Sequence, residues 1–340
     1  MLQSKHARAI SRGAQSRTVQ LASFIAIATG LAVPQARAVA TYTSFDPPNS
    51  TATHPTGINT IGTIAGWFVA PSGYTGFIRA VDGTITTFDP YANGTVMVYG
   101  INASGAATGA VNTASGKTTA FVRAANGTLL LIAISHSVSA VGNGINTKGQ
   151  VAGGYAGTDT FAHGFVSTAG GLGKGFQVNG TAGTTANAIN DAGTVAGIWG
   201  DANQVQHGFV RSASGVITSF DPPNSISTQV FAIDNAGAIT GYYSAAAGGH
   251  SYIRAANGTF TFFDVAAAGG TVSNTINSKG VTAGTYSGAH GFLRAANGKI
   301  TTFDAPNSLG TNVSGINTAG VIVGSSSKAD DLLHGYLRTP

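Results

Sequence analysis

Residues 271–304 read TVSNTINSKGVTAGTYSGAHGFLRAANGKITTFD, and this stretch decides the fold. Short segments within it carry β-branched or aromatic residues, and Gly or Asn bounds each one, which is typical of strands joined by turns. We therefore expect four strands, called a to d in chain order, at 271–276, 281–286, 290–294 and 299–303. None of these segments is long enough for a helix.

The same unit recurs along nearly the whole chain. An Ile-Asn pair, once Ile-Asp, has Gly three residues after the Asn or Asp at seven positions: Asn59, Asn102, Asn146, Asn190, Asp234, Asn277 and Asn317. The successive spacings are 43, 44, 44, 44, 43 and 40 residues. Four strands in a period of this length make one propeller blade. The sequence therefore predicts an all-β fold, a seven-bladed β-propeller of four-stranded antiparallel blades.

The two ends of the repeat array complement each other. The last repeat stops at Pro340 without its Phe-Asp strand, whereas residues 41–46 supply such a strand before the first repeat. We expect this N-terminal strand (41–46) to complete the last blade and close the ring, because an open solenoid would need a cap at each end. Residues 39–340 are then a single propeller domain.

The connections between the predicted strands are of two kinds. The a-to-b turns (Asn-x-x-Gly) and the c-to-d turns, such as 295–298, are minimal and place Gly in the left-handed position. The b-to-c and d-to-a connections vary in length and content, as at 201–206 and 220–225. In an up-and-down sheet both variable kinds emerge at one end, called here the loop-bearing face, and the minimal turns form the tight-turn face. Scaffolds place binding sites on variable loops, so we expect function on the loop-bearing face.

The first 38 residues have the pattern of an export signal. An apolar stretch at 21–33 precedes a small-x-small cleavage motif at 36–38, and the basic residues ahead of it are Lys5, Arg8, Arg12 and Arg17. Its 13 residues, at about 1.5 Å each, fall short of a bilayer core of about 30 Å. A signal peptide at 1–38 is therefore favoured over a retained transmembrane anchor. We expect a mature chain that begins at Val39 and is secreted or periplasmic in a bacterium.

Removal of this segment changes the charge of the chain. The whole sequence has 17 Lys and Arg against 12 Asp and Glu, and five of the basic residues but no acidic residue lie in 1–38. A mature chain near neutrality, without a basic cluster, predicts no nucleic-acid partner and no membrane partner. The absence of Cys excludes disulfides, zinc-thiolate sites and a cysteine nucleophile. The sequence also lacks phosphate-loop, Gly-x-Ser-x-Gly and EF-hand motifs, so we expect no cofactor and no metal.

A His-Gly-Phe triplet recurs in strand c, at 163–165, 207–209 and 290–292, with variants at 250–252 and 334–336. In this motif the chain resembles the bacterial extracellular repeat family named HAF after His-Ala-Phe, over about residues 41–338. Gly stands here where the family name has Ala, and the first two repeats lack the His. The family has no defined activity, so the resemblance implies export and repetition but no particular chemistry.

We expect each strand-c His to meet the Asp that follows strand d. Pairing c with d places Arg294 opposite Lys299 and His290 opposite Phe303, next to Asp304. The same geometry predicts three further pairs: His207 with Asp221, His250 with Asp264 and, through ring closure, His334 with Asp46. A His-Asp pair can orient a general base, but a catalytic device is normally single and this one recurs in four repeats. We therefore interpret the pairs as structural braces.

Aromatic and acidic residues supply the binding candidates. A row of aromatic residues recurs near the end of strand b. These rings can pack between blades or stack on sugar rings, and we favour packing between blades because the residues recur. Trp67 stands outside this row, and Asp159 and Asp201 lie in b-to-c connections outside the repeat pattern. The candidate binding residues are Trp67, Trp199, Tyr91, Asp159 and Asp201.

The leading hypothesis is an exported, non-enzymatic propeller that binds or scaffolds on its loop-bearing face. The expected ligand is an extracellular polysaccharide or surface glycan, because the loops are polar with scattered aromatic residues. The first alternative is a polysaccharide-degrading lyase or hydrolase on the same face, tested through Asp159 and Asp201. Glu is absent from the chain, which weakens but does not exclude a two-carboxylate mechanism. The second alternative is a purely structural surface or matrix protein.

Overall fold

A computed structural model describes residues 39–92, 94–159, 161–178, 183–265 and 270–340. The predicted signal peptide, residues 1–38, lies outside the described residues. Within the described ranges the regular elements are all β-strands, and none of them is a helix. The all-β fold that the sequence predicts is therefore observed.

The strands follow the sequence repeats. The chain enters through β1 (Thr41–Phe45). Repeat 1 contains β2 (Ala52–Ile58), β3 (Ile64–Ala70), β4 (Gly73–Arg79) and β5 (Ile85–Phe88). Repeat 2 contains β6 (Met97–Ile101), β7 (Ala107–Asn112), β8 (Thr118–Arg123) and β9 (Leu129–Leu131). Repeat 3 follows the short β10 (Ala133–Ile134) and contains β11 (Ser139–Ile145), β12 (Val151–Ala156), β13 (Ala162–Ser167) and β14 (Leu172–Phe176).

The second half of the chain repeats the same order. Repeat 4 contains β15 (Gly183–Ile189), β16 (Val195–Gly200), β17 (Gln206–Arg211) and β18 (Ile217–Phe220). Repeat 5 contains β19 (Ser227–Ile233), β20 (Ile239–Ala245), β21 (Gly248–Arg254) and β22 (Phe260–Phe263). Repeat 6 contains β23 (Thr271–Ile276), β24 (Thr282–Tyr286), β25 (His290–Arg294) and β26 (Ile300–Phe303). Repeat 7 contains β27 (Gly310–Ile316), β28 (Ile322–Ser327) and β29 (Leu333–Thr339).

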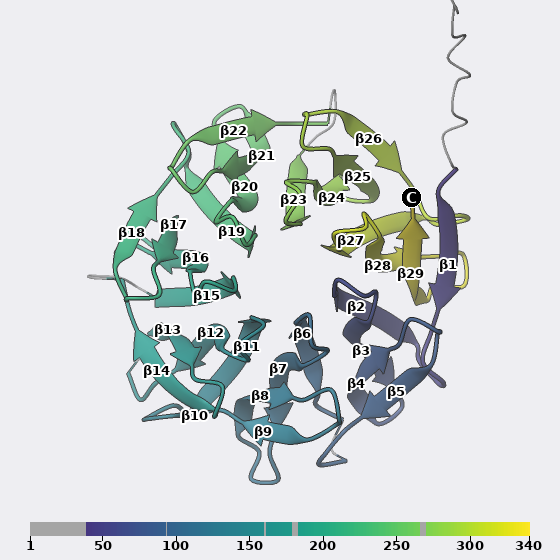
Figure 1. The fold of residues 1–340 in the computed structure, drawn as a ribbon, viewed down its shortest axis with the longest axis horizontal. Helices are drawn as coiled ribbons and strands as arrows, with labels where there is room; N and C mark the ends of the chain where they lie inside the picture. Colours follow the sequence, from purple (N-terminus) through teal and green to yellow (C-terminus); the bar gives the residue numbers. More distant parts are fainter. Residues whose placement is uncertain (1–38, 93, 160, 179–182, 266–269) are drawn as a thin grey trace, which may run out of the picture. The chain divides into compact units, whose positions relative to one another are not determined.

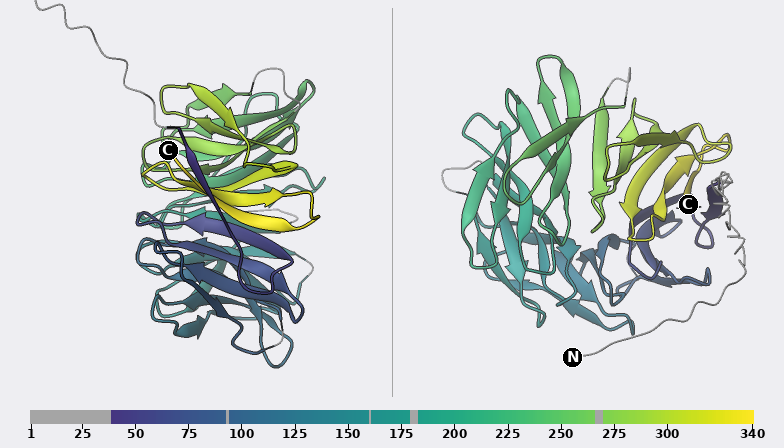
Figure 2. Two further views of the ribbon diagram at one scale, coloured as in Figure 1. Left: turned by 90° about the vertical axis from the view of Figure 1, so that its right-hand side faces the viewer. Right: turned by 45° about the horizontal axis from the view of Figure 1, so that its top comes forward.

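Consecutive strands pair antiparallel within each repeat, so that a pairs with b, b with c and c with d. In repeat 7 the place of strand d is taken by β1, which pairs antiparallel with β29 from Thr41 opposite Thr339 to Phe45 opposite Gly335. Within residues 39–340 the ladders follow one another around an axis, with strand a innermost and strand d outermost (Figure 1). Figure 2 shows the same ladders from the side. The loops of the two faces therefore lie at opposite ends of this axis.

Some pairing also links one repeat to the next. Single parallel pairs join Ala52 to Leu333 and Ala162 to Gly183. The short strand β10 pairs parallel with β14, where Ala133 faces Leu172. This extra strand is absent from the sequence prediction, because two residues carry too little periodicity to be recognised.

The predicted register between strands c and d is wrong by one residue. Arg294 lies opposite Ile300 and Gly291 opposite Phe303. The turn is longer than expected, because the Ala295 amide donates to the Lys299 carbonyl (2.9 Å) and so sets these two residues opposite each other. The corrected register places His207, His250, His290 and His334 directly across from the Asp that follows strand d.

The a-to-b turns owe their shape to the recurring Asn and Gly. The Asn277 side-chain oxygen accepts hydrogen bonds from the Lys279 and Val281 amides, at 3.0 and 3.1 Å. Gly280 has a φ of 71°, in the left-handed region that glycine adopts without steric cost. The Asn therefore starts the turn with its side chain and the Gly completes it.

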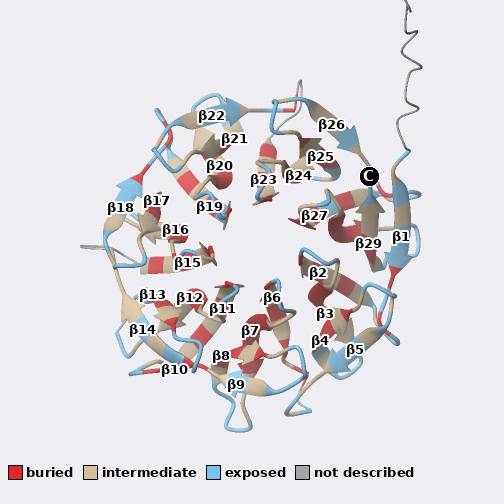
Figure 3. Cartoon of the chain, viewed as in Figure 1, coloured by how far each residue is buried: buried red, intermediate tan, exposed pale blue. Residues whose placement is uncertain are grey.

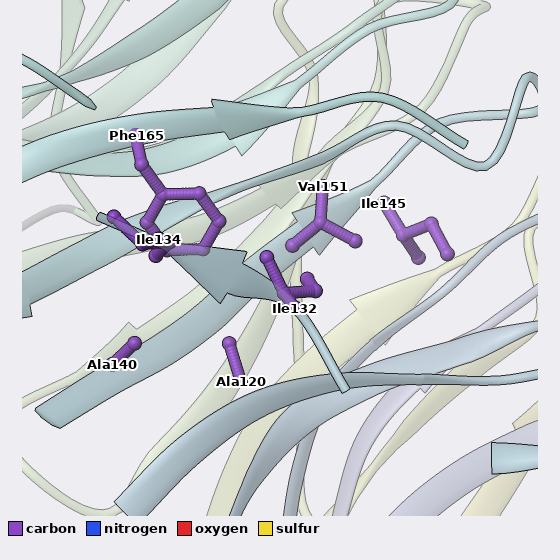
Figure 4. Close-up of a cluster of buried hydrophobic side chains, with 7 residues drawn as sticks. All are labelled: Ala120, Ile132, Ile134, Ala140, Ile145, Val151 and Phe165. Carbon is purple, nitrogen blue, oxygen red and sulfur yellow. The ribbon is translucent and has the colours of Figure 1, made fainter. Parts of the chain in front are cut away.

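The core consists of layers between neighbouring ladders, where buried residues concentrate on the inner and middle strands (Figure 3). The aromatic residue of the His-Gly-Phe triplet and its equivalents are fully buried: Phe77, Phe121, Phe165, Phe209, Tyr252, Phe292 and Tyr336. Figure 4 shows the layer between repeats 2 and 3, with Phe165, Ile132 and Ile134 among its members. Each ladder is thus stabilised by burial against both neighbours.

The Arg that ends strand c packs on the preceding repeat. Its guanidinium lies 4.7–5.0 Å above a Phe ring at the end of the preceding strand d in six cases: Arg79 on Phe45, Arg123 on Phe88, Arg211 on Phe176, Arg254 on Phe220, Arg294 on Phe263 and Arg338 on Phe303. These cation–π contacts add a polar link to each apolar layer.

Candidate functional site

The structure brings together all four predicted His-Asp pairs, at the ends of strands c and d on the loop-bearing face. The imidazole Nδ1 lies within hydrogen-bond distance of the carboxylate in each: His207 and Asp221 (2.7 Å), His250 and Asp264 (2.7 Å), His290 and Asp304 (3.1 Å), and His334 and Asp46 (2.6 Å). The last pair joins the strand that begins the described chain to the strand that ends it.

The Asp of a brace also contacts the next repeat. The Thr53 hydroxyl donates to Asp46, and the Thr228 hydroxyl donates to Asp221. Both Thr residues are fully buried in strand a of the following repeat. The carboxylate therefore ties together strand c, the end of strand d and the neighbouring ladder. This arrangement is that of a structural link, since both oxygens of Asp46 and of Asp221 are engaged.

The two candidate acids, Asp159 and Asp201, stand beside strand-c histidines. Asp159 lies 2.8 Å from Nε2 of His163, and this hydrogen bond lowers the pKa of the Asp159 carboxyl. Asp201 accepts hydrogen bonds from the Val205 and Asn203 amides, and the Val205 bond is the main cause that lowers the pKa of Asp201. A carboxyl with a lowered pKa stays ionised near neutral pH and is poorly suited to donate a proton.

Trp199 lies in the aromatic row of strand b, and the row packs on the strand-c histidines. The Trp199 ring stacks on His207, with centroids 4.5 Å apart and planes at 27°. Its indole N–H donates to the Ser219 hydroxyl at 2.8 Å. Tyr155 stacks in the same way on His163, at 5.0 Å. These rings therefore pack within their own repeats, and Trp199 is held by His207 of strand c and Ser219 of strand d.

A cavity of about 520 Å³ lies on the loop-bearing face between repeats 3 and 4. Trp199 and Ile198 from β16 supply apolar surface, and the exposed Phe161 supplies more from repeat 3. Gln204 and Gln206 contribute side-chain amides. The remaining lining residues are Ala162, Gly183, Thr185 and Gly200. Asp159 and Asp201 belong to the two b-to-c connections that supply Phe161 and Gln204.

The other two candidates lie elsewhere. Trp67 is half-buried in repeat 1, where His54 stacks on it at 3.9 Å and Tyr74 meets it edge-on at 5.3 Å. Burial lowers the pKa of the His54 imidazole. Tyr91 packs against the buried cluster between repeats 1 and 2, which includes Val96. Of the candidates, Trp199 lines the cavity, Asp159 and Asp201 lie in the connections that border it, and Trp67 and Tyr91 lie elsewhere.

Sequence reasoning missed the cavity residues Phe161, Gln204 and Gln206. All three occupy or border b-to-c connections, which the sequence identifies as variable. Their position in the sequence could have identified them. They lie in or beside the b-to-c connections of two consecutive repeats, and consecutive repeats form neighbouring ladders. Aromatic and amide side chains in two such loops would then point to one site between them.

The described residues show neither a metal cluster nor a membrane span. No group of three or more His, Cys, Asp or Glu side chains that could hold a metal ion occurs in them. Within the same ranges, no helical segment has the length and hydropathy needed to cross a membrane.

Comparison with known proteins shows the fold. No protein-family model matches the chain, and no curated protein matches it in sequence. Among solved structures it is similar to a streptogramin B lyase (10% identity, TM-score 0.61, covering 88% of this chain and 98% of the other). It is also similar to a virginiamycin B lyase from Staphylococcus aureus with quinupristin (14% identity, TM-score 0.62, covering 89% of this chain and 100% of the other). A third similar structure is the β-propeller domain of the Trilobed protease from Pyrococcus furiosus (11% identity, TM-score 0.56, covering 84% of this chain and 95% of the other). The chain therefore has a β-propeller fold. Sequence identities this low show the fold alone and do not show a shared activity.

Proposed function

We infer that the propeller has seven blades and that β1 closes its ring. Three observations support this inference. The first is the five-residue antiparallel pairing of β1 with β29. The second is a hydrogen bond of 3.3 Å from the Asn317 side chain to the Asn59 carbonyl, which joins the last repeat to the first. The third is a single cavity that residues from all seven a-to-b turns line.

We propose that the chain is an exported, non-enzymatic binding protein whose ligand is a neutral extracellular glycan. The proposed site is the cavity between repeats 3 and 4. The observation that carries the proposal is the combination of Trp199 and Phe161 with the amides of Gln204 and Gln206 around one cavity. Sugar rings present apolar C–H faces that stack on aromatic rings, and hydroxyl groups that amides can bind as donor and acceptor.

The carboxylates near this cavity favour binding over hydrolysis. A glycosidase needs one carboxyl that donates a proton, and this carboxyl normally has a raised pKa. The hydrogen bonds to Asp159 and Asp201 instead lower the pKa of both groups. These residues are better suited to accept hydrogen bonds from sugar hydroxyls.

Affinity electrophoresis, which measures binding to each of a panel of neutral polysaccharides, tests this function. The variants are Phe161→Ala and Trp199→Ala, and the matched control is Trp67→Ala at the other tryptophan. We expect both cavity variants to lose about ten-fold or more in affinity, as removal of one stacking ring costs about 1–2 kcal/mol, and the Trp67 variant to bind as the parent does. Phe161→Ala is included because Trp199 also packs on His207.

Three outcomes would count against the proposal. Absence of binding to every polysaccharide in the panel is expected of a purely structural matrix protein. Release of reducing sugars or unsaturated products from the same panel is expected of a hydrolase or lyase. Equal losses in the Trp67 and Trp199 variants would move the site away from the cavity.

We also propose that residues 1–38 direct export and are removed. The basic region, the apolar stretch at 21–33 and the motif at 36–38 support this. N-terminal sequencing of the protein recovered outside the cytoplasm of a bacterial host is expected to begin at Val39. Recovery of the uncleaved chain in the membrane fraction would support a retained anchor instead.

A further inference from the structure

The recurring Asn of the a-to-b turns forms a chain of hydrogen bonds around the axis. The side-chain amide of one Asn donates to the backbone carbonyl of the equivalent residue in the next repeat, at 2.8–3.3 Å. The donors and acceptors are Asn59 to Asn102, Asn102 to Asn146, Asn146 to Asn190, Asn190 to Asp234, Asn277 to Asn317 and Asn317 to Asn59. Each donor is buried, so each bond crosses the innermost part of one layer between repeats.

Asp234 interrupts this chain. An ionised carboxylate has no hydrogen to donate, so the Asn277 carbonyl lacks the side-chain amide that the equivalent carbonyls receive. One oxygen of Asp234 accepts the Ala238 amide at 2.8 Å, as the turn requires. The described residues supply no hydrogen bond to the other oxygen. Asp234 is nevertheless only 7% exposed. Its carboxylate oxygen, an acceptor, takes the place of the side-chain amide that the equivalent Asn residues use as a donor.

A second set of hydrogen bonds between the innermost strands is also absent at this place, although it occurs only between repeats 3 and 4, 4 and 5, and 6 and 7. Each strand a contains a β-bulge, and in three repeats the bulged residue is an Asn whose amide donates to the next strand a: Asn143 to Ala186, Asn187 to Val230, and Asn274 to Val313. In repeat 5 the bulged position between Val230 and Ala232 holds Phe231, which cannot donate and is 37% exposed. Both sets of Asn hydrogen bonds thus join repeat 3 to repeat 4, repeat 4 to repeat 5 and repeat 6 to repeat 7. Neither set joins repeat 5 to repeat 6.

The interruption faces a cavity. A cavity of about 240 Å³ lies on the axis at the tight-turn face, and both Asp234 and Asn277 line it. Asp191 of the preceding repeat lines it too, with its carboxylate held by the Thr147 amide and the Asn235 side chain, at 2.9 and 2.7 Å. Two carboxylates therefore stand on one side of an otherwise uncharged ring of lining residues.

We propose that this cavity binds one hard cation, of which Ca²⁺ is the probe, between the Asp234 carboxylate and the Asn277 carbonyl. The cation replaces the missing amide hydrogen by bridging two oxygen atoms that would otherwise repel each other. Hard cations take carboxylate, carbonyl and water oxygens, and Ca²⁺ tolerates irregular sets of six to eight of them. A cavity of this size leaves room for the waters that complete such a set. The charge of Asp191 adds a longer-range attraction.

This site differs from the proposed glycan site in face, residues and ligand class. It also differs from the expectation of no metal, which rested on the absence of Cys and of an EF-hand motif. Here most of the oxygens come from backbone and water, so such a motif is not needed. With one direct carboxylate, the affinity is expected to be that of extracellular calcium modules, with a Kd on the order of 1 mM.

The test compares the whole mature chain with Asp234→Asn and with the control Asp82→Asn. Asp82 lies in an exposed c-to-d turn outside the cavity, where its oxygen accepts the Thr84 amide. Thermal unfolding is followed with chelator, with about 10 mM CaCl₂ and with NaCl of equal ionic strength, and equilibrium dialysis measures bound Ca²⁺. We expect the parent and Asp82→Asn to bind one ion and to gain about 2–3 °C in Tm with Ca²⁺.

Asp234→Asn restores the residue found at the six equivalent positions and completes the chain of hydrogen bonds. We therefore expect a higher Tm than the parent in chelator and no further rise with Ca²⁺. The proposal is overturned if the parent binds no Ca²⁺ above the ionic-strength control. It is equally overturned if Asp234→Asn retains the Ca²⁺ effect.

Discussion

The His-Gly-Phe triplet can be explained residue by residue. The His meets the Asp after strand d, and the Phe fills the layer between ladders. The Gly leaves room for the strand-d Phe: a Cβ at Gly291 would lie 2.6 Å from the Phe303 ring. In repeat 2, where Ile132 stands across from this position and its amide donates to the Ala120 carbonyl at 2.8 Å, the Gly is replaced by Ala120. The motif therefore describes packing, and the small residue matches the size of its partner on strand d.

Gly291→Ala is expected to destabilise the fold. The added methyl group meets a ring that Arg338 covers from the next repeat, so the ring cannot move freely. Overpacking of this kind costs about 1–3 kcal/mol, which urea unfolding measures. Gly170→Ala is the control, because a Cβ there would lie 3.7 Å from its nearest neighbour. Equal stability of the two variants would contradict the packing explanation.

The Asp201 carboxylate should make the stability of the fold depend on pH. Backbone amides lower its pKa in the folded state below the ordinary value of 3.8. The contribution of the carboxylate is therefore present above about pH 4 and disappears as the pH falls through the folded-state pKa. Asp201→Asn should be less stable than the parent at about pH 5, and the difference should shrink at about pH 2.5. A difference in the free energy of unfolding that is the same at both pH values would show that the charge is not involved.

At the scale of elements, strand d is linked to two ladders in most repeats. In four repeats the Asp after strand d binds the His of strand c in the same repeat, and in two of these it also accepts a hydrogen bond from a buried Thr of the next strand a. In six cases the Phe of strand d lies under the Arg of the next repeat. The outermost strand is thus held at its C-terminal end by the polar contacts of the Asp and by one cation–π contact of the neighbouring Phe.

Thr228→Val tests this link. The substitution keeps the shape of a fully buried residue and removes the hydroxyl that donates to Asp221. A lost hydrogen bond to a charged group should cost about 1.5–3 kcal/mol of unfolding free energy. Thr218→Val on the exposed side of β18 is the control and should change stability little. A Thr228 variant as stable as this control would show that the Asp-Thr contact contributes nothing.

Most of the fold could be predicted from the sequence, because the repeat fixes strand order and the turns fix strand ends. The c-to-d register was missed by one residue, since Ala295 and Lys299 pair across the turn and sequence alone does not show that. The His-Asp pairs were found despite this error, because the Asp adjoins the strand end. Of the cavity residues, only Trp199 was among the candidates from the sequence, and Asp159 and Asp201 lie in the connections that border it. Its remaining residues depend on which loops meet between repeats 3 and 4, and the repeat pattern does not contain that information.

At the scale of the whole molecule, stability and function are assigned to different parts of the repeat. Residues shared by the repeats build the layers, the braces and the inner hydrogen-bond chain. Both proposed sites lie where repeats stop being equivalent: the variable loops around Trp199 for the glycan, and Asp234 for the cation. The proposed closure of the ring by β1 is the remaining global feature.

Closure can be tested with a disulfide, since the chain has no Cys of its own. Thr41 faces Thr339 across the β1–β29 pair, so Thr41→Cys with Thr339→Cys should oxidise to a single intramolecular bond. A loop of this length should stabilise the fold by about 3–5 kcal/mol, seen as a higher urea midpoint. Thr41→Cys with Thr261→Cys, in repeat 5, should remain reduced. Failure of the first pair to oxidise would place β1 elsewhere.

The proposed glycan site is tested most directly by the fluorescence of Trp199. The chain has two tryptophans, so Trp67→Phe leaves Trp199 as the sole indole reporter. Titration of this variant with a neutral polysaccharide that the parent binds should give a saturable change in emission, with the same Kd as calorimetry. Binding by calorimetry without any change in Trp199 emission would contradict the assignment of the cavity between repeats 3 and 4 as the site.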